Sequence, residues 1–350
     1  MSKGISNDLT CRICGNGLGN SLHTAREMFL GTRDTFEYNE CGSCGTLQVQ
    51  QVPDLKPYYP ASYYSFQPAN ETPGKLPATL PVRVKKRLGA FLRRRSANYY
   101  CERHAPGGNK NLLGRYVAEN MRRMTVGFPE YLKDTSHYLS LNLNSKILDV
   151  GCGSGTTLLS LREFGFINLI GVDPFLETAI TYGNGVRILK AELEELEAGF
   201  DLIIASHSLE HVPEPRHALQ QISRLLKKGQ WAIIRIPLVG HAWERYRTAW
   251  VALDAPRHLF IFSRQTFSNL AAEAGFEVAE VAFDSTAVQF WGSEQYLLDI
   301  PLMDERSYFV NPQNSIFSAQ QITEFARKAT ELNKREEGDQ AIFYLRKPSD

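Results

Sequence analysis

Residues 146–155 read KILDVGCGSG, an apolar run followed by glycine at every second position. A β-strand that ends in such a turn and continues into a helix at Thr156 brings bare backbone and free N–H groups close to a ligand. The dinucleotide pattern GxGxxG requires glycine where Thr156 stands, so this stretch departs from that fingerprint. Asp149, at the end of the strand, disfavours a pyrophosphate and favours an ammonium group. The stretch therefore suits a nucleoside that carries an amino acid.

Further polar residues follow the next apolar runs. Asp173 stands 22 residues beyond Gly151, where an acid can accept both hydroxyls of a ribose. The third run ends at Ala191-Glu192, placed for an adenine contact, and the fourth ends at Ser206-His207. We expect all of them to face one crevice, because the carboxyl ends of parallel strands meet at one edge of a sheet.

From residue 143 onward, short apolar runs alternate with helical patterns, which predicts a doubly wound parallel α/β sheet. The expected strands are 146–150, 168–172, 186–189, 200–205, 230–236, 277–283 and 341–346. The expected helices include 156–164, 215–226, 264–274 and 319–332.

Length and composition limit the class of protein. The chain has 350 residues, which suggests two domains and a connector, and its 43% hydrophobic and 22% charged residues are ordinary for a globular protein. A net charge of +1 argues against a partner bound by bulk charge, so we expect no nucleic acid. There is neither an apolar run of 18 residues nor an apolar signal segment at the start. We therefore expect a cytoplasmic protein with reduced thiols.

Four cysteines near the N-terminus form two CxxC pairs, Cys11/Cys14 and Cys41/Cys44. Two such pairs supply four thiolates, which complete a tetrahedral shell around a structural Zn²⁺ ion. Two disulfides, redox-active CxxC pairs and an iron site are the alternatives. We expect residues 1–70 to form a small zinc-binding domain that lacks a core of its own.

The charge is unevenly distributed. Residues 72–101 contain eight Lys or Arg and no Asp or Glu, so the rest of the chain has a net charge of −7. We expect residues 71–135 to form a basic linker and helical connector. Val84, Leu88, Phe91 and Leu92 lie on one face of its first helix. This stripe either packs against the neighbouring domain or, through residues 82–95, contacts an anionic membrane or a lipid-linked substrate at its periphery.

Residues 146–347 resemble class I S-adenosylmethionine (SAM)-dependent methyltransferases. The motifs ILDVGCGSG, GVDP, AELEEL, FDLIIASHSLEHVPEP and LLKKGQWAIIRIP occur in the order found in that family. The resemblance implies a seven-stranded sheet of order 3-2-1-4-5-7-6, with the seventh strand antiparallel, in a domain expected to span 136–350. It also implies that glycines cradle SAM, that Asp173 holds its ribose and that Glu192 approaches its adenine. The cofactor-binding residues predicted in this way are Asp149, Gly151, Cys152, Gly153, Ser154, Gly155, Asp173, Pro174, Ala191, Glu192, Ser206 and His207.

The N-terminal half adds a second resemblance. The two CxxC pairs and the sequence YYPASYYSF at 58–66 are similar to bacterial methyltransferases with a zinc-binding head, many of which act in sugar, antibiotic or surface-polysaccharide pathways.

One sequence motif resembles a metal-binding motif but lacks the helix that such a motif requires. His207-Ser-Leu-Glu210-His211 spells HxxEH, which resembles an inverted zinc-peptidase motif. That motif needs a helix, whereas here an expected strand precedes it and Pro213 follows. We therefore place it in the loop after the fourth strand, where His211 either borders the substrate or braces the loop.

Candidates for acceptor chemistry lie in the long insertion 237–262. His258 is the first candidate for a general base, with Asp254 to orient it, and His241 is the second. Arg257 is a candidate for binding an anionic group of the acceptor. Trp243 and Tyr246 would form an aromatic wall. Loop bracing by His258 and simple helix packing by the two aromatic residues are the alternatives.

Together these features predict a methyltransferase for a small-molecule or glycan acceptor, most specifically a sugar hydroxyl in polysaccharide or secondary-metabolite biosynthesis. A C-methyltransferase of a nucleotide-linked keto sugar is the closest alternative, since the same base would form an enolate. An RNA methyltransferase and a non-catalytic binding module are further alternatives.

Overall fold

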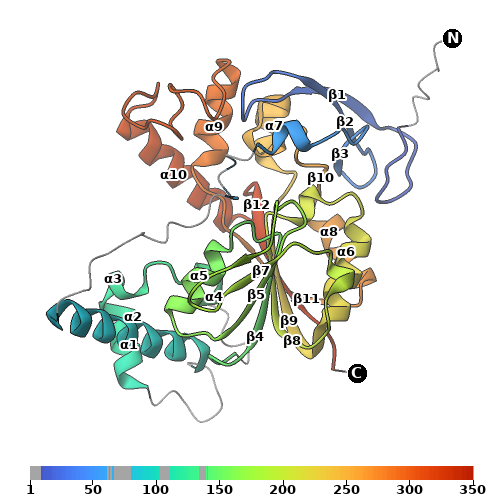
Figure 1. Cartoon of the computed structure of the whole chain (residues 1–350). Helices are drawn as coiled ribbons and strands as arrows, with labels where there is room; N and C mark the ends of the chain where they lie inside the picture. Colours follow the sequence, from blue (N-terminus) through green and yellow to red (C-terminus); the bar gives the residue numbers. More distant parts are fainter. Residues whose placement is uncertain are drawn as a thin grey trace.

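The computed structural model describes residues 9–60, 63, 65–66, 80–102, 111–133, 139 and 141–349 (Figure 1). Its largest element is an eight-stranded sheet with the order β11-β12-β9-β8-β4-β5-β7-β6. The strands are β4 (Lys146–Val150), β5 (Asn168–Val172), β6 (Ile180–Thr181), β7 (Arg187–Leu189), β8 (Phe200–Ser206), β9 (Leu226–Pro237), β11 (Glu277–Phe283) and β12 (Gln340–Arg346).

Seven of these strands follow the expected order, and β12 runs antiparallel to both β9 and β11. The expected count of seven was too low by one short strand. The amide of Tyr182 donates to the carbonyl of Val186, and this turn folds β6 back onto β7 as an antiparallel edge strand.

Both faces of the sheet are buried. Along β4 and β8, Ile147 and Leu202 belong to one apolar cluster, whereas Leu148 and Ile203 belong to the other. Strands buried on both sides are continuously apolar, which is why the sequence shows runs here rather than alternation. Helices α1 (Leu80–Glu102) and α5 (Thr156–Glu163) contribute to one cluster, and α6 (Pro215–Leu225) and α8 (Arg264–Glu273) contribute to the other.

The N-terminal segment forms a second sheet of order β1-β2-β3-β10. Three of its strands come from the N-terminal segment that carries the four cysteines, which we call the head: β1 (Ser21–Arg26), β2 (Thr35–Glu40) and β3 (Leu47–Val49). The fourth, β10 (Phe260–Ile261), comes from the insertion after β9. The expected division at residue 70 therefore separates strands of one sheet. The second sheet includes β10 because β3 is entirely buried and needs a hydrogen-bonding partner on its outer edge, which β10 supplies.

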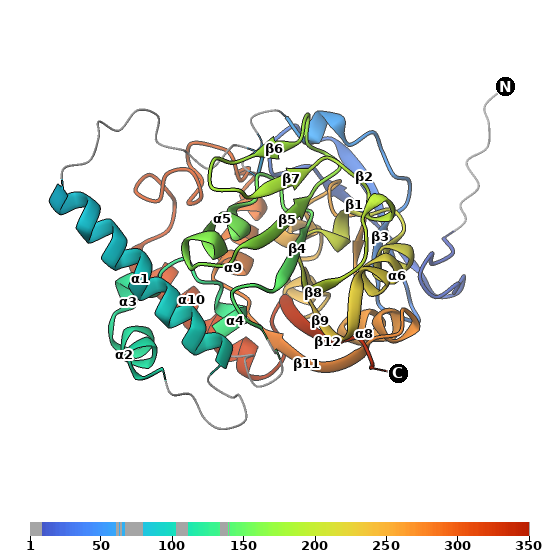
Figure 2. The same cartoon turned by 60° about the horizontal axis from the view of Figure 1, so that its bottom comes forward.

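The connector contains α1, α2 (Leu112–Asn120), α3 (Arg122–Thr125) and α4 (Glu130–Lys133), and α1 runs along one side of the molecule (Figure 2). Ala97 and Tyr100 anchor the second half of α1 in the core. Leu88 and Phe91, expected either to dock or to face a membrane, are 55% and 44% exposed. No described helix is both long and apolar enough to cross a bilayer.

The remaining helices lie beside the N-terminal sheet, at the end of the molecule where the parallel strands of the large sheet have their carboxyl ends (Figure 1). They are α7 (His241–Tyr246), α9 (Val288–Leu297) and α10 (Ala319–Lys334). The head is linked to this layer through Met28 and Phe29, whose carbonyls accept from the amides of Leu302 and Met303. These elements enclose the edge of the sheet at which the polar residues gather.

Candidate active site

The glycine turn between β4 and α5 is held in a conformation that favours glycine. Gly151, Gly153 and Gly155 have φ values of 66°, 53° and 82°. A Cβ atom on Gly151 would lie 2.4 Å from Cβ of Ser208, and one on Gly153 would lie 2.4 Å from the carbonyl oxygen of Ser65. The turn therefore leaves no space for side chains, as the sequence led us to expect.

Two buried carboxyl groups stand at the ends of β4 and β5. Burial and the nearby Asp173 raise the pKa of Asp149 to about 7. Asp173 accepts from the amides of Gly153 at 2.8 Å and Phe175 at 2.9 Å, while burial raises its pKa. Asp173 thus points toward the glycine turn. A cation bound at this place would favour the ionised form of Asp149.

The other residues predicted to bind the cofactor border the same edge of the sheet or lie close to it. Ser154 donates its amide to Ser65 and accepts from the hydroxyl of Tyr182, while Cys152 is partly buried within the turn. Pro174 and Ala191 follow β5 and β7 and are half-buried. Glu192 is exposed and caps η2 (Leu193–Glu195). Ser206 ends β8, and His207 follows it with a positive φ of 52°.

Residues of the aromatic stretch 58–66, which the sequence analysis had not placed at the site, contact the glycine turn and the residues around it. The carbonyl of Ser65 accepts from the amide of Ser154 at 2.7 Å. The ring of Tyr59 stacks on Phe175 at 5.4 Å, and its hydroxyl lies 3.0 Å from Nδ1 of His211. The dense aromatic pattern at 58–66 was the available signal, but it does not reveal which strand edge such a segment covers.

A hydrogen-bonded chain follows β8. Nη1 of Arg235 donates to Nε2 of His207 at 2.8 Å, so the proton of a neutral His207 ring is on Nδ1, which lies 3.2 Å from Oε1 of Glu210. Glu210 lies in η3 (Leu209–His211) and is 0% exposed. Burial alone would raise its pKa, but the hydrogen bond from His207 and the three nearby imidazoles lower it to about 2. Glu210 is therefore an ionised, buried acceptor that the sequence analysis missed.

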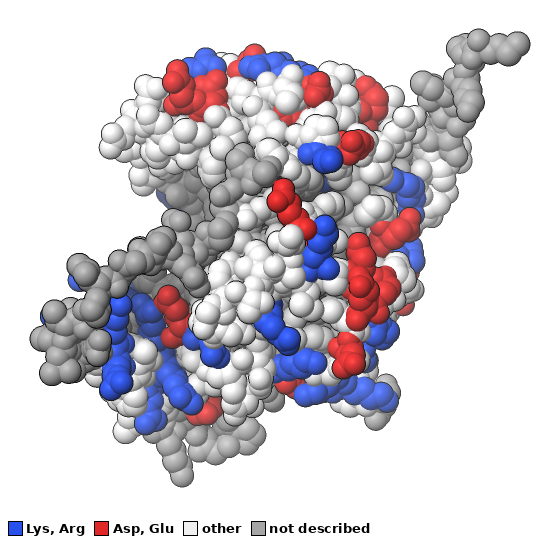
Figure 3. All heavy atoms as spheres, viewed as in Figure 1, with Lys and Arg blue, Asp and Glu red and all other residues white. Residues whose placement is uncertain are grey.

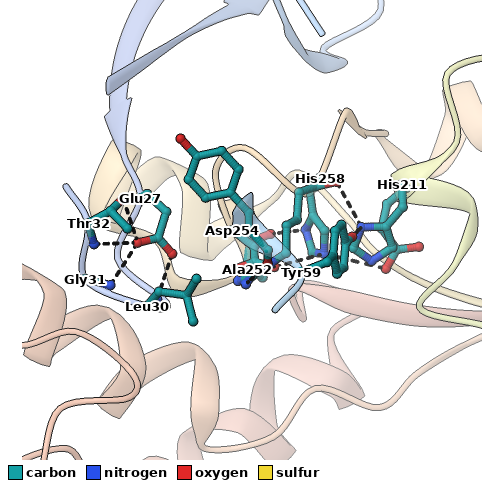
Figure 4. A network of polar contacts seen from close by, with 12 residues as sticks. Glu27, Leu30, Gly31, Thr32, Tyr59, His211, Ala252, Asp254 and His258 are labelled. Atoms are coloured by element: carbon teal, nitrogen blue, oxygen red, sulfur yellow. Dashed lines mark hydrogen bonds and ion pairs between the residues drawn. The ribbon is translucent and has the colours of Figure 1, made fainter. Parts of the chain in front are cut away.

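His211 and His258 lie side by side (Figure 4), with ring centroids 4.7 Å apart. Glu210 lies beside both rings. Nδ1 of His211 lies 2.9 Å from the carbonyl of Arg257, and Nδ1 of His258 lies 2.7 Å from the carbonyl of Ala252. Nε2 of His258 is 3.9 Å from Oε1 of Glu210. Burial and the neighbouring His258 lower the pKa of His211 to about 4. We call Glu210, His211 and His258 the histidine–glutamate cluster.

Two expectations for the insertion need correction. Arg257 is 0% exposed, forms a two-point ion pair with Asp254 and has its guanidinium 3.8 Å from the centre of the Phe29 ring. It is therefore enclosed by protein and does not face an acceptor. Asp254 is occupied by this pair and lies 3.8 Å from Nε2 of His258, whose orientation is set by the carbonyl of Ala252 instead.

The expected aromatic wall is also packed inside. Trp243 is 1% exposed and donates to Glu40 at 2.9 Å, and Tyr246 is 4% exposed and donates to Glu294 at 2.8 Å. Helix packing, the alternative considered for both residues, describes these contacts. His241 is the first residue of α7 and is not part of the described histidine–glutamate cluster.

The four N-terminal cysteines are gathered as one group of free thiols. Sγ of Cys11 lies 3.7 Å from Sγ of Cys44, and Sγ of Cys14 lies 3.5 Å from Sγ of Cys41. Four sulfurs at about 2.3 Å from a tetrahedral zinc ion are about 3.8 Å apart, so the group fits zinc. The amide of Cys44 also points at Sγ of Cys41, at 3.5 Å.

The cysteine group is coupled to the histidine–glutamate cluster through the second sheet. Tyr38 on β2 is fully buried and donates to the carbonyl of His258 at 2.7 Å. The carbonyl of Cys44 accepts from the hydroxyls of Ser263 at 3.0 Å and Thr266 at 2.8 Å. The head therefore supports the loop that carries His258.

Comparisons with known proteins find similarity to methyltransferases. Residues 119–281 match the family model described as a methyltransferase domain. The ubiquinone biosynthesis O-methyltransferase of Rickettsia canadensis is 28% identical over 170 residues, which cover 43% of this chain and 71% of that protein. The tRNA U34 carboxymethyltransferase of Alteromonas mediterranea is 24% identical over 187 residues, which cover 46% of this chain and 55% of that protein.

Among solved structures, the [4+2]-cyclase SpnF gives a TM-score of 0.42 at 17% identity, covering 76% of this chain and 96% of that one. The mycolic acid cyclopropane synthase CmaA1, complexed with SAH and CTAB, gives a TM-score of 0.41 at 18% identity. The match covers 60% of this chain and 80% of that one. The family match and the curated relatives identify a class I SAM-dependent methyltransferase domain in this chain. The protein is thus an enzyme that uses SAM. The family model begins at residue 119, inside the expected connector.

Proposed function

We propose that this enzyme transfers the methyl group of SAM to a hydroxyl oxygen of a small-molecule or glycan acceptor. The observation that carries the proposal is the histidine–glutamate cluster, in which Glu210 and His211 follow β8 and His258 comes from the insertion after β9. Ser208, in the same loop, touches Gly151 of the glycine turn. A hydroxyl held at the cluster is therefore near any methyl group presented by a nucleoside in that turn. Relatives named O-methyltransferases support the choice of oxygen.

The binding of SAM is assigned to the glycine turn and its two acids. Asp149 would pair with the ammonium group, because its carboxylate is buried beside a second carboxylate and gains most from a cation. Asp173 would accept from the ribose, and Glu192 would approach the adenine. Methyl transfer from a sulfonium is an in-line displacement, so the main task of these residues is to position the donor.

The acceptor hydroxyl is assigned to the histidine–glutamate cluster. Oε2 of Glu210 is buried and has no hydrogen-bond partner among the described residues. An ionised carboxylate oxygen in that state accepts strongly from a hydroxyl. Nε2 of His211 and of His258 are the ring nitrogens that the carbonyl contacts leave available for the hydroxyl proton. Within this class of acceptor, a sugar is our specific proposal.

A methyl-transfer assay tests the proposal. Purified protein and SAM with a labelled methyl group would be offered nucleotide-linked sugars, small phenols and tRNA in separate reactions. We expect O-methylation in the first or second reaction. The rate of methyl transfer should be at least 100-fold lower with Glu210→Gln. It should be unchanged with His217→Gln, because His217 is exposed and pairs with Glu194. SAM binding should survive both changes. An equal rate in Glu210→Gln would refute the role of the cluster.

The position of the new methyl group separates two functions. A C-methyltransferase of a keto sugar would produce a carbon-bound methyl group that resists acid, whereas an O-methyl product has a characteristic methoxy resonance. Methylation of tRNA alone would support the nucleic-acid alternative, which one relative's name brings into consideration.

We also propose that the basic face of α1 contacts anionic lipid, which would bring the enzyme to a lipid-linked acceptor. Leu88 and Phe91 are exposed there, and Lys or Arg side chains gather at the same end of the molecule (Figure 3). The exposed basic residues of α1 are Lys85, Lys86, Arg87, Arg94 and Arg95. Sedimentation with vesicles should occur with anionic and not with neutral lipid, and Phe91→Ser should weaken it. Binding that is equal for both vesicles would contradict the proposal.

For the head, we propose that Cys11, Cys14, Cys41 and Cys44 hold one structural zinc ion. The donor set supports this, because four thiolates without an open position are typical of structural sites. We further propose that residues 1–70 form the zinc-binding part, that 71–135 connect it, and that the catalytic domain spans 136–350, with β10 joining the first part to the last.

A further inference from the structure

The histidine–glutamate cluster has the composition of a second metal site. One ligand atom from each of Glu210, His211 and His258 lies within 4.8 Å of the other two. Two imidazoles and one carboxylate are a donor set that binds divalent transition metals at sites with open positions. The cluster shares no residue with the four cysteines.

Both imidazoles are already oriented as metal ligands usually are. A backbone carbonyl only accepts, so the contacts with Arg257 and Ala252 place the ring protons of neutral His211 and His258 on Nδ1, and the hydroxyl oxygen of Tyr59 then accepts from His211. The unprotonated nitrogen is then Nε2 in each ring. A ligating histidine almost always donates its other N–H to a carbonyl or carboxylate in this way, which fixes the tautomer.

The carboxylate supplies an independent observation. Glu210 is 0% exposed, and only one of its oxygens is explained, since Oε1 lies 3.2 Å from Nδ1 of His207. Oε2 is buried and has no hydrogen-bond partner among the described residues. An unpaired buried carboxylate oxygen is costly, and buried charges of this kind are normally paired or coordinate a metal. His207 is in turn fixed by Arg235 at 2.8 Å, which holds Glu210 in place.

We propose that Glu210, His211 and His258 bind a divalent transition-metal ion, such as Zn²⁺ or Fe²⁺, separate from the zinc of the cysteines. At about 2.0–2.2 Å from the metal, two donors are at most about 4.4 Å apart, close to the 4.8 Å within which the three ligand atoms lie. Imidazole ligands favour these metals over Mg²⁺ and Ca²⁺, which prefer oxygen. Three protein ligands leave at least one position open.

The open position has a use that rests on the proposed function: with the metal bound, the acceptor hydroxyl contacts the ion in place of its direct contacts with Oε2 of Glu210 and the two Nε2 atoms. A hydroxyl oxygen bound to the metal loses its proton more readily, because the metal stabilises the alkoxide. The proton passes to solvent, the oxygen forms the new C–O bond, and the electrons of the C–S bond remain on sulfur, which leaves as a neutral thioether. The reaction is balanced without an oxidant or reductant.

The metal content of the full chain tests this site. Protein stripped with a chelator would be dialysed against zinc chloride and then, in a second experiment, against cobalt chloride. We expect two ions per chain in the wild type and in His217→Gln, and one in Glu210→Gln and His258→Ala. The ion that these variants lose should lack the thiolate-to-metal absorption of cobalt, whereas the ion lost in Cys41→Ser should carry it. SAM binding by calorimetry shows that each variant is folded.

Other outcomes distinguish this proposal from the proposed function. One ion per chain in the wild type, unaffected by Glu210→Gln, overturns the second metal site even if methyl transfer to a hydroxyl is found. Two ions with the expected losses, but no transfer to any hydroxyl, support the site and overturn the O-methyltransferase function. If both hold, removal of the second ion should slow methyl transfer at least 100-fold, with SAM binding unchanged.

Discussion

Replacing Asp149 with asparagine should stabilise the protein without ligand at alkaline pH and, at the same time, abolish SAM binding. Burial and Asp173 raise the pKa of Asp149 from 3.8 to about 7. A raised pKa means that the folded state holds more protons than the unfolded chain between these two values, so its stability falls as the pH rises through this window. Above pH 7 the full cost of the buried charge is present, and asparagine removes it.

The size of the effect follows from the pKa shift. The shift is about 3 units, and at about 1.4 kcal/mol per unit it corresponds to about 4 kcal/mol of unfolding free energy at pH 8. At about pH 3 the carboxyl group is largely protonated in both states, so the gain should approach zero. Bound SAM would stabilise the ionised form in the wild type, and its affinity should therefore rise between pH 6 and pH 7.

Urea denaturation at pH 5 and pH 8, with calorimetric titration of SAM, measures both effects. The matched control is Glu177→Gln, because Glu177 is an exposed acid shortly after β5. Asp149→Asn should gain stability chiefly at pH 8 and lose the heat of SAM binding. An equal gain at both pH values, or SAM affinity within twofold of the wild type, would refute the assigned role of Asp149.

Three further changes test the glycine turn, the head and the metal site. Gly153→Ala places a methyl group 2.4 Å from the carbonyl of Ser65 at a φ of 53°, so we expect a loss of about 2 kcal/mol in urea denaturation and weaker SAM binding. Tyr38→Phe leaves the buried carbonyl of His258 without its donor, and should cost about 1–3 kcal/mol and lower kcat while KM for SAM stays constant. Cys41→Ser should remove one zinc ion per chain, detected by elemental analysis, and lower Tm.

Each of these predictions has a matched control. Gly89→Ala changes an open position in α1 and should be neutral or stabilising. Tyr116→Phe removes the hydroxyl of a ring that is 59% exposed and should leave kcat unchanged. Cys101→Ser should keep the metal content. The reasoning is wrong wherever a variant and its control behave alike.

The sequence predicted the large sheet well because its information is local. Strands buried on both faces are short apolar runs, and the bounds of β4, β5 and β11 agree with the expected ranges at both ends. The glycine turn was recognisable because few residues other than glycine fit that backbone, and Asp173 was recognisable from its position after the next apolar run. The edge strand β6 was missed because two residues carry no periodicity.

The acceptor side of the site was less predictable because it depends on contacts far apart in the sequence. Arg257 looked available until the structure placed Phe29 and Asp254 around it. Glu210 looked like part of a local HxxEH motif, although its environment also includes His258, 48 residues away. No spacing rule predicts that pairing, since tertiary packing alone brings the two residues together.

The pairing of β3 with β10 has a consequence for protein engineering. Chimeras that exchange the N-terminal segment of one such enzyme for that of another would join mismatched halves of a single sheet, and the misfit would reach His258 through the backbone. A functional exchange therefore has to transplant residues 238–262 along with the segment that carries the cysteines.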